Sequence, residues 1–231
     1  TLADEIYARV DWRWAQNCAP AISHGWHPET GFIRWDWTGY NESMIVYLLA
    51  LGSPTFAVEP AAWDAWTSTY DKNWGTDGGL PYLRFPPLFG HQFTHVWVDF
   101  RGLTDKYMRG RGIDYFENSR RATLAQRAHA IVNPDGWAAY GADVWGITAC
   151  DGPADVERLS GGKVRHFMSY AGRGMGRHDD GTIAPYGAGS SIPFAPEVAI
   201  PAVAAMHERY GAQIYGRFGF FAFNPSFTFT D

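Results

Sequence analysis

Glu42 combines a carboxylate with strongly apolar neighbours. It follows Tyr40 and Asn41 and comes directly before the apolar run 44–50. Cleavage of a glycosidic bond needs one carboxylic acid that protonates the leaving oxygen and a second carboxylate that activates water or attacks the sugar. Apolar surroundings help such an acid to keep its proton. Two roles for Glu42 therefore stay open: a general acid, or a first-turn partner of a helix dipole with Asn41 as the N-cap.

Further carboxylates stand in polar, glycine-rich segments, where a side chain can face a ligand. Asp-Gly is also a common turn sequence, so the segments 151–153 and 179–182 have a structural alternative. Glu197 follows Pro196 at the start of an expected helix, where an acidic side chain stabilises the helix dipole by default. The remaining candidates for contacts to a substrate are Asp99, Asp143, Asp151, Asp179 and Asp180.

Aromatic residues are unusually frequent, with 11 Trp, 12 Tyr and 15 Phe. Many lie beside Gly, Asp and His in loop-like sequence, as in Gly25-Trp26-His27 and Asp135-Gly136-Trp137. Aromatic faces next to carboxylates suit a flat, polar, neutral ligand such as a sugar ring, although packing beneath long loops explains them equally well. We expect a groove lined by Trp35, Trp37, Trp137 and Trp145 in some combination.

Several other kinds of chemistry are disfavoured. Cys18 and Cys150 belong to no Cys-x-x-Cys pair, and a disulfide between them stays open. The glycine-rich residues 172–174 lack the pattern of a nucleotide-binding loop, and no Gly-x-Ser-x-Gly motif is present. His91 and His95 are four residues apart, but no glutamate stands between them as in zinc proteases. We therefore expect no metal and no other cofactor.

The overall composition is that of a globular domain. The chain has 231 residues, of which 46% are hydrophobic and 19% charged, and this excludes a disordered chain. The net charge of -5 and the absence of a basic run argue against nucleic-acid binding. No apolar stretch is long enough to cross a membrane. Since no linker is visible, residues 1–231 are expected to form one domain.

Hydrophobic periodicity and capping signals predict helices connected by long loops. Residues 134–194 are mostly Gly, Pro, Asp and aromatic residues, and a loop region of this length is usually functional. Strand-like sequence is expected only over 218–230, and residues 88–99 stay open between helix and strand. The sequence therefore predicts an all-α domain, with helices over residues 2–16, 42–50, 60–70, 113–132 and 196–210.

The order of these motifs resembles a known family. The characteristic segments include Gly39-Tyr40-Asn41-Glu42-Ser43-Met44, Asp99-Phe100-Arg101-Gly102 and Tyr140-Gly141-Ala142-Asp143-Val144-Trp145-Gly146. Together they resemble the bacterial glycoamylase-like domain, which includes the endo-β-1,2-glucanases of glycoside hydrolase family 144. The resemblance runs nearly end to end, and the remaining matching segments are residues 48–55, 87–92, 113–123, 148–153, 179–182 and 191–197.

The resemblance implies an (α/α)6 toroid and metal-free hydrolysis of β-1,2-glucan or its oligosaccharides with inversion. It implies that Glu42 is the general acid. It also implies a glucan as the binding partner and a location in the periplasm or outside the cell. We further expect a monomer that does not insert into a membrane. The expected substrate-binding residues are Asp36, Trp37, Tyr40, His91, Asp143, Trp145, Asp151, Asp180 and Glu197.

Two alternatives stay open beside hydrolysis. Relatives with a longer domain carry further acidic segments at both ends, so the toroid is expected to be incomplete here and the usual catalytic base to lie outside the chain. A non-catalytic sugar-binding fragment is one alternative for that reason. The other alternative is a transglycosylase of cyclic β-1,2-glucan metabolism.

Overall fold

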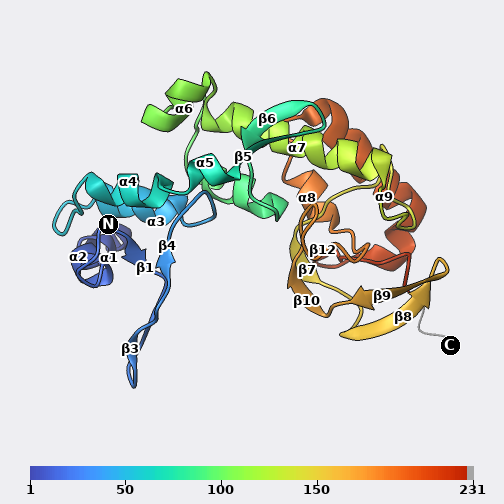
Figure 1. Cartoon of the computed structure of the whole chain (residues 1–231), viewed down its shortest axis with the longest axis horizontal. Coiled ribbons are helices and arrows are strands. Elements are labelled where there is room, and N and C mark those ends of the chain that lie inside the picture. The colour runs from blue at the N-terminus through green and yellow to red at the C-terminus, as the bar shows by residue number, and fades with distance from the viewer. Residues whose placement is uncertain (228–231) are drawn as a thin grey trace. The chain divides into compact units, whose positions relative to one another are not determined.

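The computed structural model describes residues 1–227 and divides into two compact units (Figure 1). Unit 1 comprises Thr1–Trp74 and unit 2 comprises Gly75–Asp231. That residues 1–231 make a single domain stays a prediction.

Unit 1 is built from short helices and two small strand pairs. Strand β1 pairs with β4 and β2 pairs with β3, both in antiparallel register. The expected helix over residues 2–16 is split, because the Asp11 side chain accepts a hydrogen bond from the backbone N–H of Trp14 and starts a new helix there. The elements of unit 1 are α1 (Leu2–Tyr7), α2 (Trp12–Ala15), β1 (Ile22–Ser23), β2 (Trp26–His27), β3 (Gly31–Phe32), β4 (Asp36–Trp37), α3 (Met44–Leu51), α4 (Ala61–Thr67) and α5 (Tyr70–Asn73).

Aromatic side chains from α3, α4 and α5 fill the core of unit 1. Tyr47, Trp66 and Tyr70 are completely buried, and their rings contact one another in tilted and edge-on arrangements. The Tyr47 hydroxyl donates to the carbonyl of Trp37 at 2.6 Å and accepts from the N–H of Ile22 at 3.0 Å. The core thereby fixes the β1–β4 pair against α3.

The long helices of unit 2 are α7 (Tyr115–Val132) and α9 (Pro196–Ile214) (Figure 1). Helix α7 matches its predicted bounds closely, because Asp114 caps its start and Asn133 ends it in the left-handed conformation. Helix α9 continues past Gly211, where the sequence predicted its end, and contains Pro201. The other helices are 3₁₀ turns η1 (Leu88–His91) and η2 (Phe93–Val96), and α6 (Lys106–Arg111) and α8 (Pro185–Gly189).

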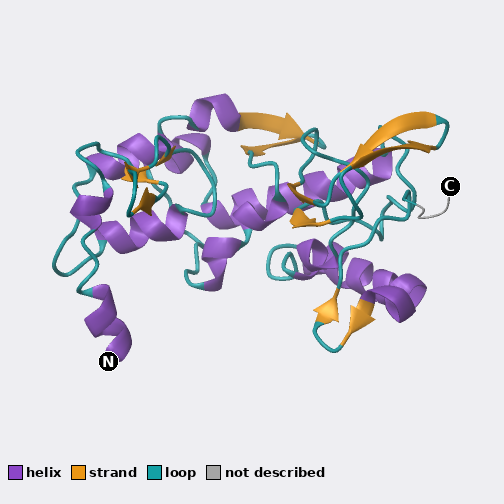
Figure 2. Cartoon of the chain, turned by 90° about the horizontal axis from the view of Figure 1, so that it is seen from below, coloured by secondary structure: helices purple, strands orange, loops and turns teal. Residues whose placement is uncertain are grey.

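Unit 2 also contains several two-stranded ladders (Figure 2). Strand β8 pairs with β9 through a two-residue turn at Gly161 and Gly162, both of which have positive φ angles. Strand β7 pairs with β10 in antiparallel register. The strands of this region are β5 (Trp74–Asp77), β6 (Leu80–Leu83), β7 (Ala149–Asp151), β8 (Val156–Ser160), β9 (Lys163–Phe167), β10 (Tyr170–Gly172), β11 (Tyr215–Gly216) and β12 (Gly219–Phe220).

The prediction of an all-α toroid is wrong for this chain. Helices account for 37% of the structure and strands for 19%. Much of the difference comes from residues 134–194, which were expected to be loop but include two ladders. Of the strand expected over 218–230, only β12 is regular, and residues 228–230 lie outside the described residues.

One apolar cluster supports unit 2. Helices α7 and α9 contribute small or flexible side chains such as Ala122, Ala125, Ala199 and Met206, which let larger groups approach.

Among the described residues, no helix has both the length and the apolar character needed to cross a bilayer.

Candidate active site

Glu42 lies in a tight turn directly before α3, which begins at Met44 rather than at Glu42. The side-chain oxygen of Asn41 accepts a hydrogen bond from the backbone N–H of Ser43 at 2.9 Å. The indole N–H of Trp66 donates to the hydroxyl of Ser43 at 3.1 Å. Residues on both sides of Glu42 are therefore tied to the core of unit 1.

Gly39 brings the chain into this turn. Its φ angle is +80°, and a β-carbon there would lie 2.5 Å from the hydroxyl of Thr69. Its N–H donates to the carbonyl of Trp66 at 2.6 Å. Only glycine combines this backbone conformation with such close packing, so Gly39 places the Glu42 turn firmly against α4 and the segment that follows it.

One oxygen of the Glu42 carboxylate, Oε2, is buried and has no hydrogen-bond partner among the described residues. An unsatisfied buried acceptor costs about 1–3 kcal/mol, and native structures retain few of them. The N-cap of α3 is Ser43 and the helix begins at Met44, so Asn41 is not the N-cap and Glu42 does not lie in the first turn. A catalytic role of Glu42 stays a prediction.

Three further predicted contacts also lie in unit 1. Asp36 is exposed on β4, and the half-buried ring of Trp37 lies 3.8 Å from the His24 ring, centroid to centroid. Burial of Tyr40 is nearly complete, and its ring packs edge-on against Tyr70. Asp36 is thus accessible to a ligand, whereas Tyr40 belongs to the core.

His91 lies in the interior of unit 2. Its Nε2 atom accepts from the N–H of Phe85 at 3.2 Å, and its Nδ1 atom lies 3.4 Å from the amide nitrogen of Asn118. Burial lowers the pKa of His91 to about 3, so the ring is neutral at physiological pH. These contacts are structural, and a contact between His91 and substrate stays a prediction.

Trp137 and Trp145 are buried in the apolar cluster of unit 2. Stacking on a sugar needs an accessible ring face, which neither residue offers. Trp35 is 73% exposed and Trp37 is half-buried, so these two remain available for stacking. The expected aromatic groove is therefore reduced to its unit 1 members.

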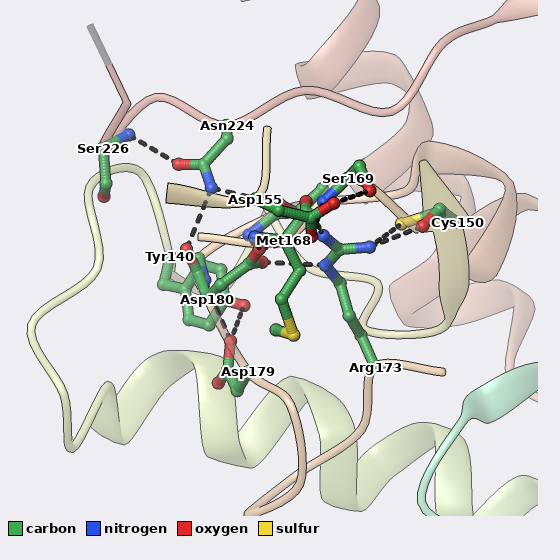
Figure 3. Close-up of polar contacts among 12 residues, drawn as sticks. Tyr140, Cys150, Asp155, Met168, Ser169, Arg173, Asp179, Asp180, Asn224 and Ser226 are labelled. Carbon is green, nitrogen blue, oxygen red and sulfur yellow. Dashed lines mark hydrogen bonds and ion pairs between the residues drawn. The ribbon is translucent and has the colours of Figure 1, made fainter. Parts of the chain in front are cut away.

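Asp180 is completely buried and saturated with hydrogen bonds (Figure 3). Arg173 binds its two oxygens with two nitrogens, each at 2.8 Å, and the backbone N–H groups of Met168 and Thr182 also donate to it. Burial opposes ionisation, but these hydrogen bonds and the Arg173 charge outweigh it and lower the pKa of Asp180. Every contact seen here is structural, and substrate binding by Asp180 stays a prediction.

Other candidate carboxylates are also partnered. Asp179 accepts from the Tyr140 hydroxyl at 2.7 Å and lies 3.3 Å from His129, as an oxygen-to-nitrogen distance. Exposed ion pairs engage the remainder: Asp99 with Arg101 at 3.0 Å, Asp143 with Arg209 at 3.7 Å, and Glu197 with Arg120 at 2.9 Å. Exposed pairs of this kind are weak, so a ligand can replace them.

Asp151 differs from these carboxylates. It is exposed at the end of β7 and has no ion pair or hydrogen bond from its side chain to any described residue. It lines a cavity of about 710 Å³ together with Tyr170, Tyr186 and Phe221. A second cavity of about 650 Å³, with Trp97 in its wall, also includes Tyr186.

The described residues contain no cluster of three or more His, Cys, Asp or Glu side chains that could hold a metal ion. Both cysteines are free thiols: Cys18 is exposed in unit 1, and Cys150 is buried in unit 2. Among the predicted site residues, Glu42, Asp36, Trp37 and Tyr40 lie in unit 1 and the others lie in unit 2.

Residues 34–230 match the model of the Glycoamylase family, described as "Putative glucoamylase". The chain belongs to this family. The match confirms the resemblance on which the sequence analysis relied.

Named relatives act on β-1,2-linked glucose. The chain is 27% identical over 243 residues to an exo β-1,2-glucooligosaccharide sophorohydrolase (non-reducing end) of Parabacteroides distasonis, covering 94% of this chain and 31% of that protein. It resembles the endo-β-1,2-glucanase of Chitinophaga pinensis, solved with sophorotriose and glucose, with 26% identity, a TM-score of 0.79, and coverage of 96% of this chain and 52% of that one.

A "putative glucoamylase" of Bacteroides fragilis is also similar, with 30% identity and a TM-score of 0.82, over 96% of this chain and 51% of that chain. The chain therefore spans a third to a half of the length of the relatives that it matches.

Sequence reasoning missed two features of unit 2. Arg173 was noted only within a glycine-rich patch, and nothing local marks it as the partner of Asp180. Tyr170 and Tyr186 were not singled out, although their cavity also contains Asp151. The signal that could have found Tyr170 is the Gly161-Gly162 pair, which predicts a hairpin and a return of the chain toward residues 149–151.

Proposed function

We propose that this chain supplies the general acid of a glycoside hydrolase that cleaves β-1,2-linked glucan as a monomer. The observation that carries the proposal is the buried, unpartnered Oε2 atom of Glu42 on a turn fixed by Asn41, Ser43 and Gly39. The family and the named activities of the relatives support the substrate class.

The reaction transfers one proton from Glu42 to the oxygen that links two glucose units. The bond between that oxygen and the anomeric carbon breaks, and the freed chain leaves as an alcohol. Water attacks the anomeric carbon from the opposite face and gives its proton to a second carboxylate. This attack from the opposite face inverts the configuration at the anomeric carbon. Among the predicted partners in unit 1, Asp36 and the Trp37 ring are accessible to hold the sugar beside the acid.

The test is the hydrolysis of linear β-1,2-glucan, followed through new reducing ends. Glu42→Gln removes the proton donor and is expected to lower the rate by roughly 10²–10⁴-fold, because general acids contribute about that much. The loss should be much smaller for an aryl glycoside whose leaving group needs little protonation. Thermal unfolding of the variant should match that of the wild type.

Glu59→Gln is the matched control, since Glu59 is an exposed glutamate of the same unit. Full activity of Glu42→Gln on the glucan would overturn the proposal. Binding of glucan by the wild type without turnover would instead support the non-catalytic alternative, and new linkages without new reducing ends would support transglycosylation.

A further inference from the structure

We infer that the cavity beside the β7–β10 ladder is a binding subsite for one pyranose ring, in which Tyr170 stacks against the ring and Asp151 binds its hydroxyl groups. The inference rests on the proposed function, because it takes a neutral glucan as the ligand. It extends that function by assigning part of the binding to unit 2.

The strand register places the two side chains together. Asp151 pairs directly with Tyr170 across the antiparallel ladder, so both side chains project from the same face. Residues opposite each other in this way have β-carbons about 4.5–5.5 Å apart. The next pair, Cys150 and Ala171, is buried and points to the other face.

The cavity has the size and surface of a small-ligand site. Its volume of about 710 Å³ lies within the usual range of about 300–1,000 Å³. Tyr170 is 67% exposed and Phe221 is half exposed, so flat apolar surface is open to a ligand. A sugar ring offers C–H groups to such surfaces and hydroxyl groups to the carboxylate beside them.

The charges of the lining residues disfavour an anionic ligand. Asp151 is the one charged residue among those that line the cavity within the described part of the chain. An anion would be repelled by Asp151, and no arginine or lysine stands in the wall to bind one. Because Asp151 has no partner among the described residues, both of its oxygens are free to accept hydrogen bonds from neighbouring hydroxyl groups.

Hydrogen bonds from Arg173 support the backbone of the ladder (Figure 3). Arg173, fixed by Asp180, donates to the carbonyl of Cys150 within β7 and to the carbonyl of Met168, two residues before β10. The Tyr186 hydroxyl donates to the carbonyl of Ala149 in β7. Binding groups that are positioned before the ligand arrives lose little entropy on binding, so this support favours affinity.

The experiment measures binding of sophorotriose by calorimetry to the full chain carrying Glu42→Gln, which keeps the ligand intact. Tyr170→Ala and Asp151→Asn are each expected to weaken binding by about tenfold or more, because each removes one main contact. Tyr170→Phe retains the ring and should bind nearly as well as the parent. Phe218→Ala and Glu157→Gln change exposed residues outside the cavity and serve as controls.

Unchanged affinity in both Tyr170→Ala and Asp151→Asn would overturn the inference and leave the role of Glu42 intact. Weaker binding in both variants, combined with no hydrolysis by the chain that retains Glu42, would support the subsite and reject the proposed hydrolase. Equal weakening by the two control variants would show that general destabilisation caused the effect, and would overturn the inference.

Discussion

Glu42 in unit 1 and Asp180 in unit 2 are carboxylates with opposite surroundings. Asp180 is completely buried and receives hydrogen bonds from Arg173 and two backbone N–H groups. Glu42 is partly accessible, yet its buried Oε2 atom receives none from the described residues. The sequence predicted a ligand role for both. The comparison teaches that burial alone does not identify a structural carboxylate. What distinguishes the two is whether hydrogen-bond donors of the chain already occupy the carboxylate oxygens.

The strongest test of this contrast is Asp180→Ala. Removal of one partner leaves the Arg173 charge buried and uncompensated, which is expected to cost about 3–5 kcal/mol of unfolding free energy. Urea denaturation would measure it. The control is Asp143→Ala, whose exposed ion pair contributes less than about 1 kcal/mol. A similar small change in Asp180→Ala would contradict the structural role.

Gly152→Ala tests the close packing around the same ion pair. A β-carbon at Gly152 would lie 2.2 Å from an Arg173 nitrogen and 2.3 Å from the carbonyl oxygen of Met168. Relief of this overlap is expected to cost about 3 kcal/mol in urea denaturation. The same substitution at Gly110, a helical position with open space around it, should instead stabilise the protein by about 0.5–1 kcal/mol. Equal effects at both sites would show that Arg173 can move aside.

Burial of His91 makes the free energy of unfolding depend on pH. Its pKa falls from 6.5 to about 3 on folding, so between these values the unfolded chain binds a proton that the folded chain does not. The contribution of His91 to stability is therefore lost as the pH drops below 6.5, by about 2 kcal/mol between pH 7 and pH 5.

Unfolding free energies at several pH values would measure this slope. Burial also lowers the pKa of His95, to about 4, so His91→Gln should remove only about half of the slope and His91→Gln combined with His95→Gln most of it. His166→Gln, on an exposed strand position, should leave the slope unchanged. A full slope that persists in the double variant would place the titrating group elsewhere.

The smallest expected effect is that of Glu42→Gln on stability. Because Oε2 has no partner among the described residues, the substitution removes no favourable contact of that atom and should change the unfolding free energy by less than about 1 kcal/mol. Differential scanning calorimetry would detect a larger loss. Such a loss would place Glu42 with Asp180 as a structural carboxylate.

Local signals predicted some elements well. Asp114 and Asn133 mark both ends of α7 in the sequence, because capping depends on neighbouring residues alone. The hairpin of β8 and β9 was missed, since Leu159 and Val164 are exposed and give no burial alternation. Its two-glycine turn was the usable signal.

The site was predictable only in part. The Glu42 turn could be recognised from its sequence and from the family resemblance. The contact between Arg173 and Asp180, by contrast, depends on how a loop folds back, and no local rule specifies it. Whether Trp145 faces the core or a ligand is likewise decided by tertiary packing, so composition could not exclude it from the groove.

Alkylation of the free thiol of Cys150 can measure how often the interior of unit 2 opens. Burial raises its pKa to about 11, so at pH 7.5 roughly one molecule in 3,000 carries the reactive thiolate. Because the Cys150 side chain is also buried, we expect an alkylating reagent to reach it mainly when the structure around it opens, and to reach the exposed Cys18 sooner. The slow phase of alkylation thus reports how often this interior opens under native conditions, without denaturant.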